Sequence, residues 1–201
     1  WIQDNYPGPL RTYMLSGGMD TEKRTSFVNS LKGRGSKVTA ELTIPRKVLM
    51  EVLRITPEQM MHGQQISTTA ALLTGASNNA AHPANGLAAL FMATGQDMAN
   101  IAEANQCTVY THLTREGDLH YSITMPALIM ATFGGGTNLA TQRECLELMD
   151  CFGKDKAYKL LEIAAGMVVA GELSLSAATK RDKATGKNEW VDAHEKLGRN
   201  R

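Results

Sequence analysis

A stretch dominated by small residues, from Ser67 to Thr94, constrains the fold more than any other part of the sequence. Small side chains let helix backbones approach one another closely, so this stretch predicts a buried helix, entered near Pro83 and packed tightly against others. A second long helix is expected from about Lys156 to Ala178, because apolar residues recur there at helical spacing. The buried small-residue helix is expected to be central.

Short strands are expected beside the helices. Apolar and polar residues alternate from Lys37 to Ile44 and from Leu119 to Met125, a pattern typical of half-buried strands. A third strand is expected at Cys107 to Leu113, and the turn-forming residues 114–118 predict a β-hairpin between it and the strand that follows. Thr56-Pro57-Glu58-Gln59 can cap a further helix, because a threonine and a glutamine at this spacing form a capping box. The predicted fold class is α+β.

The composition narrows the class of protein. With 201 residues, 43% of them hydrophobic and 20% charged, the chain can bury one sizeable core, which argues against disorder and against a coiled coil. The formal net charge of +1 leaves no overall field to attract nucleic acid or an anionic membrane. The longest apolar stretches, such as Ala164 to Ala170, are shorter than the roughly 20 residues of a membrane span, so none is expected. The first residues do not resemble a signal peptide. The chain starts at Trp1, without an initiator methionine, as a fragment would.

The cysteines indicate neither a disulfide framework nor a structural zinc site. Cys107, Cys145 and Cys151 are odd in number and lack C-x-x-C spacing. A reducing compartment is the simplest interpretation.

Three polar clusters could carry chemistry. The stretch from Ser16 to Arg24 combines a hydroxyl, glycines, carboxylates and cations, which together can hold a carboxylate or phosphate and leave one lysine to polarise a carbonyl. His82-Pro83-Ala84-Asn85 places two polar side chains among small apolar ones. Gly95-Gln96-Asp97 lies inside a helical pattern from Gly86 to Asn105, where a buried carboxylate would need a cationic partner to stay ionised. Taken singly, a solvated turn, satisfied core residues and an exposed carboxylate are the more common outcomes.

Two further features are weaker. Gly134-Gly135-Gly136 precedes a helical pattern from about Thr141 to Met149 and could accept a phosphate at its backbone N–H groups, but the G-x-G-x-x-G spacing of a Rossmann fold is absent. Neither a Walker G-K-[ST] motif nor the G-x-S-x-G of serine hydrolases occurs. His194 is a candidate for proton transfer, because histidine commonly serves as a general acid or base, although a lone histidine is usually a surface residue.

In this order the motifs resemble those of the 3-hydroxy-3-methylglutaryl-CoA (HMG-CoA) reductase family, in the C-terminal part of its catalytic region. The likeness runs from about Tyr6 to Leu175, with a weaker match at the extreme C-terminus. The matching segments are Ser16-Gly17, Thr21 to Arg24, Gly33-Arg34-Gly35, Thr43-Ile44-Pro45, Ala81 to Asn85, Gly95-Gln96-Asp97, Met125-Pro126, Thr132 to Thr137 and Ala170 to Leu175.

The resemblance implies reduction of HMG-CoA to mevalonate and free CoA by two hydrides from NADPH or NADH, a step of isoprenoid and sterol biosynthesis. Lys23 would stabilise the oxyanion that forms at the thioester carbon. Asp97 would hold that lysine and tune proton transfer. His194 aligns with the family's histidine near the C-terminus and would protonate the departing CoA thiolate.

Binding residues follow from the same resemblance. Substrate-binding residues are expected at Ser16, Glu22, Arg24, His82 and Asn85, and cofactor-binding residues at Gly134, Gly135, Gly136 and Thr137. Glu22 replaces the family's aspartate and Arg24 its lysine, changes that keep the charge but alter reach and fork geometry. A further substrate lysine of the family falls at about Gln65. Altered substrate handling is therefore expected.

The resemblance implies the family's α+β arrangement, a helix-rich domain around a central apolar helix with a short β-sheet. It also divides the chain into three parts. Residues 1–15 would be a remnant of the small cofactor domain, residues 16–178 the C-terminal part of the substrate-binding catalytic domain, and residues 179–201 a polar tail that carries the candidate histidine. The family's catalytic glutamate, in an E-N-V-I-G motif, and its cofactor motif D-A-M-G-M-N lie upstream, so this chain alone is expected to be inactive. Because the family's active site forms between two subunits, a homodimer or higher homo-oligomer is expected. The protein would be cytoplasmic, or on the cytosolic face of the endoplasmic reticulum if a membrane anchor precedes this segment.

Two other functions are considered. A catalytically inactive homologue could keep a CoA-binding or dimerisation role on the same fold. A small acyl-CoA-binding or acyl-transfer domain is what loops and composition alone would suggest, and the ordered motifs make it remote.

Overall fold

A computed structural model describes residues 1–9, 21–179 and 189–197 of the chain. A three-stranded antiparallel sheet lies at its centre, made of β1 (Ser36–Ile44), β2 (Thr108–Leu113) and β3 (Leu119–Leu128). The strand order is β1-β3-β2, so the hairpin strand β3 is central. The predicted strands and the hairpin are confirmed.

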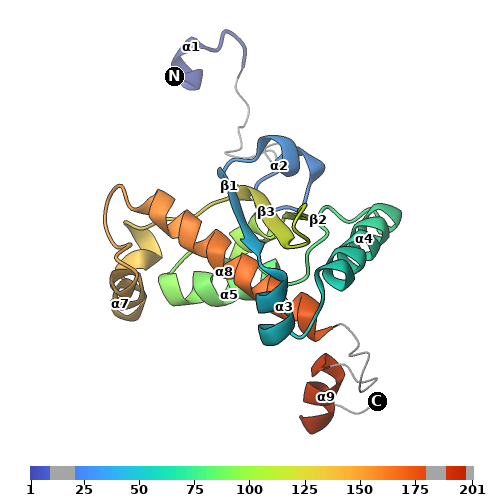
Figure 1. Ribbon diagram of the computed structural model, residues 1–201. Coiled ribbons are helices and arrows are strands. Elements are labelled where there is room, and N and C mark those ends of the chain that lie inside the picture. The colour runs from blue at the N-terminus through green and yellow to red at the C-terminus, as the bar shows by residue number, and fades with distance from the viewer. Residues whose placement is uncertain (10–20, 180–188, 198–201) are drawn as a thin grey trace.

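Helices surround this sheet, and Figure 1 shows the long helix α8 crossing one side of it. The helical elements are α1 (Ile2–Asn5), α2 (Phe27–Lys32), α3 (Arg46–Val52), α4 (Pro57–Thr74), α5 (Pro83–Thr94), η1 (Met98–Asn100), α6 (Ile101–Ala104), η2 (Gly135–Asn138), α7 (Ala140–Leu148), α8 (Ala157–Ala178) and α9 (Glu189–Lys196). The molecule is an α+β structure, as the sequence predicts.

The main core lies where α8 packs against the sheet and α5 packs against α8. Alternation along β3 turns Tyr121, Ile123 and Met125 to this side, and all three are fully buried. Residues of α8 at helical spacing, such as Ala164 and Val168, are buried against them. Among the described residues α8 is the one helix long and apolar enough to span a membrane by length and composition, a length that the apolar stretches of the sequence do not predict, and 44% of that window is buried within the protein.

The small-residue stretch from Ser67 to Thr94 forms two helices instead of one. Gly75 ends α4 with a φ of 69°, a left-handed conformation that glycine adopts readily, and a new helix begins at Pro83 as predicted. The prediction of a single buried helix is therefore wrong for the C-terminal half of α4, where Leu72 and Leu73 are 79% and 83% exposed. The buried apolar helices are α5 and α8.

The capping box predicted at Thr56 is present. The Thr56 hydroxyl accepts the backbone N–H of Gln59 at 3.2 Å, and the Gln59 side chain accepts the N–H of Thr56 at 3.0 Å. The predicted helix from Gly86 to Asn105, in contrast, is interrupted, because Gly95 ends α5 with a φ of 68°. Asp97 consequently lies in a short link between two helices, where its side chain can turn outward.

Candidate active site

Lys23 and Asp97, two residues predicted to be catalytic, form an ion pair. The Lys23 ammonium Nζ lies 2.7 Å from Oδ2 of Asp97, and about half of each side chain is exposed. Oδ1 of the same carboxylate accepts the backbone N–H of Ala99 at 3.1 Å, which fixes it at the start of η1. The hydrogen bond from Lys23 is the largest influence that lowers the pKa of Asp97, and the same bond raises the pKa of Lys23. Both groups are therefore charged at neutral pH.

The turn that carries Lys23 has an unusual backbone. Thr21 and Lys23 both have a φ of 57°, in the left-handed region that residues other than glycine rarely adopt. Asn29 of α2 is fully buried beneath this turn and donates to the backbone oxygens of Thr21 and Arg24 at 3.2 and 2.9 Å. The Thr21 hydroxyl donates to Oδ1 of Asn29 at 2.6 Å. Sequence reasoning missed Asn29, whose role depends on these contacts.

Two more charged residues lie against the turn. The carboxylate of Glu103, on α6, is fully buried and accepts the backbone N–H of Lys23 at 2.5 Å and Nη2 of Arg34 at 2.7 Å. Arg34 also lies 3.6 Å from the carboxylate of Glu22, one of the predicted substrate residues. The sequence patterns place Arg34 only in the G-R-G motif and assign no role to Glu103.

A cavity of about 340 Å³ opens beside Asp97. Its lining combines the link after α5, the chain that follows β3 and the glycine loop: Gly95, Gln96, Asp97, Asn100, Ile129, Met130, Ala131, Phe133, Gly134, Gly135, Gly136 and Thr137. The predicted cofactor loop and the predicted catalytic aspartate thus share one cavity.

The glycine loop is fastened to the link that carries Asp97. Gly95 and Gly136 approach so closely that a Cβ on Gly136 would lie 2.5 Å from the carbonyl oxygen of Gly95. The Gln96 side chain accepts the N–H of Ala131 at 2.6 Å and donates to its carbonyl oxygen at 2.8 Å. Glycine at position 136 and the amide of Gln96 therefore set the distance between the loop and the ion pair.

The cavity suits one end of a nicotinamide cofactor. Its volume lies near the lower limit of the roughly 300–1,000 Å³ typical of small-molecule sites, enough for a flat ring but not for a whole dinucleotide. Gly134 and Gly135 have open space where a side chain would stand, and Ile129, Met130 and Phe133 supply apolar surface. These residues fit the ring and its immediate neighbours.

His82 and Asn85 lie at the opposite end of α5 from Asp97. The 12 residues of α5 give it a length of about 18 Å, which separates His82 at its N-cap from Gly95 at its C-cap. The buried carboxylate of Glu172, on α8, accepts the N–H of Ala81 at 3.0 Å and that of His82 at 2.7 Å. The structure therefore does not bring the two sets of predicted site residues together within one chain.

Comparison with known proteins identifies the family. The family model described as hydroxymethylglutaryl-coenzyme A reductase matches residues 1–199. The chain belongs to the HMG-CoA reductase family. It is 40% identical over 208 aligned residues to the 3-hydroxy-3-methylglutaryl-coenzyme A reductase of Aeropyrum pernix, and the alignment covers 99% of this chain and 47% of that protein. The reductase of Pyrococcus horikoshii is 39% identical, with 98% and 48% covered, and reductase 1 of Oryza sativa subsp. japonica is 38% identical, with 89% and 35% covered.

The chain spans about half the length of the HMG-CoA reductases of Aeropyrum pernix and Pyrococcus horikoshii that it matches. The match to the family model extends through the α9 segment that carries His194.

Three other residues predicted from the HMG-CoA reductase motifs are His194, Arg24 and Ser16. His194 lies on α9, where its ring stacks on Trp190 with 3.7 Å between ring centroids and its Nδ1 is 2.7 Å from the Trp190 carbonyl oxygen. Figure 1 shows α9 beyond the C-terminal end of α8, on the opposite side of the molecule from α2. Arg24 belongs to the same turn as Lys23. Ser16 lies outside the described residues.

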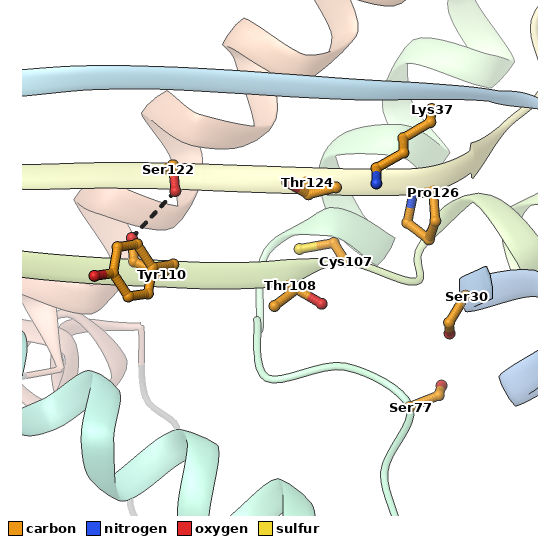
Figure 2. Close-up of a pocket in the computed structure, with 9 residues that line it drawn as sticks. All are labelled: Ser30, Lys37, Ser77, Cys107, Thr108, Tyr110, Ser122, Thr124 and Pro126. Atoms are coloured by element: carbon orange, nitrogen blue, oxygen red, sulfur yellow. Dashed lines mark hydrogen bonds between the residues drawn. The ribbon is translucent and has the colours of Figure 1, made fainter.

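A second cavity, of about 300 Å³, lies beside Ser122 and Thr124, on the face of the sheet away from the buried side chains of β3 (Figure 2). None of the predicted site residues lines it. Hydroxyl groups dominate its lining, including those of Ser30, Ser77 and Ser122, and Lys37 extends over it. Cys107 is also present, but burial raises the pKa of its thiol to about 12, so no thiolate nucleophile forms at neutral pH. The cavity that contains Asp97 is the better candidate active site.

Proposed function

We propose that the protein reduces HMG-CoA to mevalonate and CoA with two equivalents of NAD(P)H. The observation that carries this proposal is the Lys23–Asp97 ion pair at the edge of the glycine-lined cavity. Membership of the HMG-CoA reductase family supports it. The nicotinamide cofactor would be held by residues 134–137 and would supply hydride to the substrate.

The charge of Lys23 does the electrostatic work in this proposal. Reduction of a thioester carbonyl places negative charge on its oxygen, and an ammonium group held in a fixed position stabilises that charge more than mobile water does. Asp97 orients the ammonium group and keeps it protonated, because the ion pair raises the pKa of Lys23. Since the lysine stays charged, it would mainly stabilise the negative charge on the substrate oxygen, and it could then donate a proton to that oxygen.

The arrangement along α5 supports a site shared between two copies. His82 and Asn85 begin the helix, whereas the ion pair lies beyond its other end, about 18 Å away. One substrate could contact both sets if His82 and Asn85 came from a second copy. His194, which we propose as the acid that protonates the CoA thiolate, could approach by the same route. We also propose that the protein is cytoplasmic or attached to the cytosolic face of the endoplasmic reticulum.

The direct test measures oxidation of NADPH and NADH with HMG-CoA by the full-length product of the gene that encodes this chain. Lys23→Met and Asp97→Asn should each lower kcat by about 10²–10³-fold, the usual cost of losing one electrostatic stabiliser. Lys47→Met is the matched control, because Lys47 is 82% exposed and pairs only weakly with Glu51. Unchanged rates in both site variants, or no oxidation by the wild type, would contradict the proposal. CoA binding without oxidation would instead indicate the inactive homologue.

A mixing experiment tests the shared site. Lys23→Met and Asn85→Ala proteins should each be nearly inactive, but mixed dimers should recover activity, because one of their two sites contains both wild-type residues. No recovery after subunit exchange would place both residues in the same chain's site.

A further inference from the structure

The main chain of Lys23 needs support from outside its own turn. With a φ of 57°, Lys23 has a backbone conformation that persists in residues other than glycine only where surrounding contacts hold it. The direction of its side chain depends on that conformation. Contacts to its backbone therefore decide whether the ammonium group reaches Asp97.

The turn is attached to two separate elements. Asn29 of α2 binds the backbone oxygens on either side of Lys23, at Thr21 and Arg24. Facing it, α6 makes two contacts, since Glu103 accepts the N–H of Lys23 at 2.5 Å and the carbonyl oxygen of Ala102 accepts the Thr25 hydroxyl at 3.1 Å. The short segment 97–104 thus supplies both the partner of the Lys23 side chain and the partner of its backbone.

Burial of the Glu103 carboxylate costs free energy, which is unusual for a residue that only stabilises the fold. Its side chain has no exposed surface, and within the described residues its second carboxylate oxygen, Oε2, has no hydrogen-bond partner. Burying a carboxylate with half of its acceptor capacity unused opposes folding, and an apolar residue of similar volume often serves a core as well. The other oxygen nevertheless holds two donors at once, the Lys23 N–H and the Arg34 guanidinium.

We propose that Glu103 is a positioning residue that fixes the backbone of Lys23 so that its ammonium group meets Asp97. Arg34 donates to the same carboxylate oxygen and holds it in place. The effect on catalysis rests on the proposed function, whereas the effect on the ion pair does not. A merely structural role for Glu103 would stabilise the fold without altering the Lys23–Asp97 contact.

NMR titration of the full 201-residue chain separates these two roles. In the wild type, Asp97 holds the pKa of Lys23 above its ordinary value. In Glu103→Gln the released ammonium group should lose part of this rise, and the pKa of Asp97 should return toward its ordinary value. Glu172→Gln is the matched control, because Glu172 is also a buried carboxylate that accepts backbone N–H groups but has no contact with Lys23. Unchanged pKa values in a folded Glu103→Gln variant would overturn the proposal.

A measurement on the wild type keeps the proposal testable even if the variant does not fold. The Lys23 N–H should exchange with solvent much more slowly than the N–H groups of an open turn, because it donates to a buried carboxylate. Exchange at the rate of an unprotected loop would contradict the assigned contact.

Kinetics then test the catalytic consequence in the full-length protein. Glu103→Gln should lower kcat at least tenfold with little change in KM, and the same substitution in a Lys23→Met background should cause no further loss. Equal losses in both backgrounds would show that Glu103 acts independently of Lys23. If the wild type oxidises no cofactor, the proposed function fails while the NMR result still decides the role of Glu103.

Discussion

Replacing Glu172 with leucine should destabilise the protein by removing the acceptor at the start of α5. The leucine side chain fills a similar volume, but the N–H groups of Ala81 and His82 lose the oxygens that now accept them at 3.0 and 2.7 Å. A buried donor left without an acceptor costs about 1–3 kcal/mol, and partial access of water to this end of α5 favours the lower half of that range. Two such donors give an expected loss of about 2–4 kcal/mol in the free energy of unfolding.

Thermal and urea unfolding of the full chain, followed by circular dichroism, would measure this loss. For a chain of this size about 1 kcal/mol shifts the Tm by about 2–4 °C, so Glu172→Leu should lower the Tm by about 4–16 °C. Glu172→Gln keeps one acceptor oxygen and should cost about 1 kcal/mol. Glu162→Gln, at an exposed position of the same helix, should change stability by less than about 0.5 kcal/mol. A leucine variant as stable as the Glu162 control would refute the capping role.

Three further outcomes are expected. Gly166 has open space at its Cβ position on α8, so Gly166→Ala should raise the unfolding free energy by about 0.5–1 kcal/mol in the same assay. In Gly171→Ala the methyl group would overlap the His82 ring, so a lower Tm and a shifted His82 imidazole resonance are expected. A hydrogen bond from Lys159 is the largest influence that holds the pKa of Asp150 at about 2. Because this value is below the ordinary 3.8, the stabilisation is present above about pH 4 and is lost as the pH falls toward 2. A carbon-13 titration of Lys159→Met should show a higher pKa for Asp150.

Local sequence patterns predict most of the secondary structure. The alternation in β1 and β3 and the capping box at Thr56 depend on residues a few positions apart, so the sequence contains the necessary information. The two errors concern helix ends. Gly75 and Gly95 each end a helix inside a stretch whose small residues continue the helical pattern, and only their left-handed conformations reveal the ends.

The candidate site is predicted less completely, because its supporting contacts are distant in sequence. Glu103 and Lys23 are separated by 80 positions, and Glu172 and His82 by 90. Each glutamate does leave one local signal, since it stands alone among small or apolar neighbours where an exposed carboxylate would be unusual. That signal predicts a buried charge but not its partner. The pairing of Lys23 with Asp97 was expected from the resemblance and agrees with the structure.

The two buried glutamates, Glu172 and Glu103, hold backbone groups near the opposite ends of α5. Glu172 holds the N-terminal end of α5, where His82 and Asn85 begin the helix, and Glu103 holds the turn that meets Asp97 beyond the C-terminal end. Because α5 is packed between α7 and α8, the distance between these ends cannot adjust to a bound substrate without disturbing the core. If the proposed function is right, a reaction that needs both sets of residues would draw one set from a second copy of the chain.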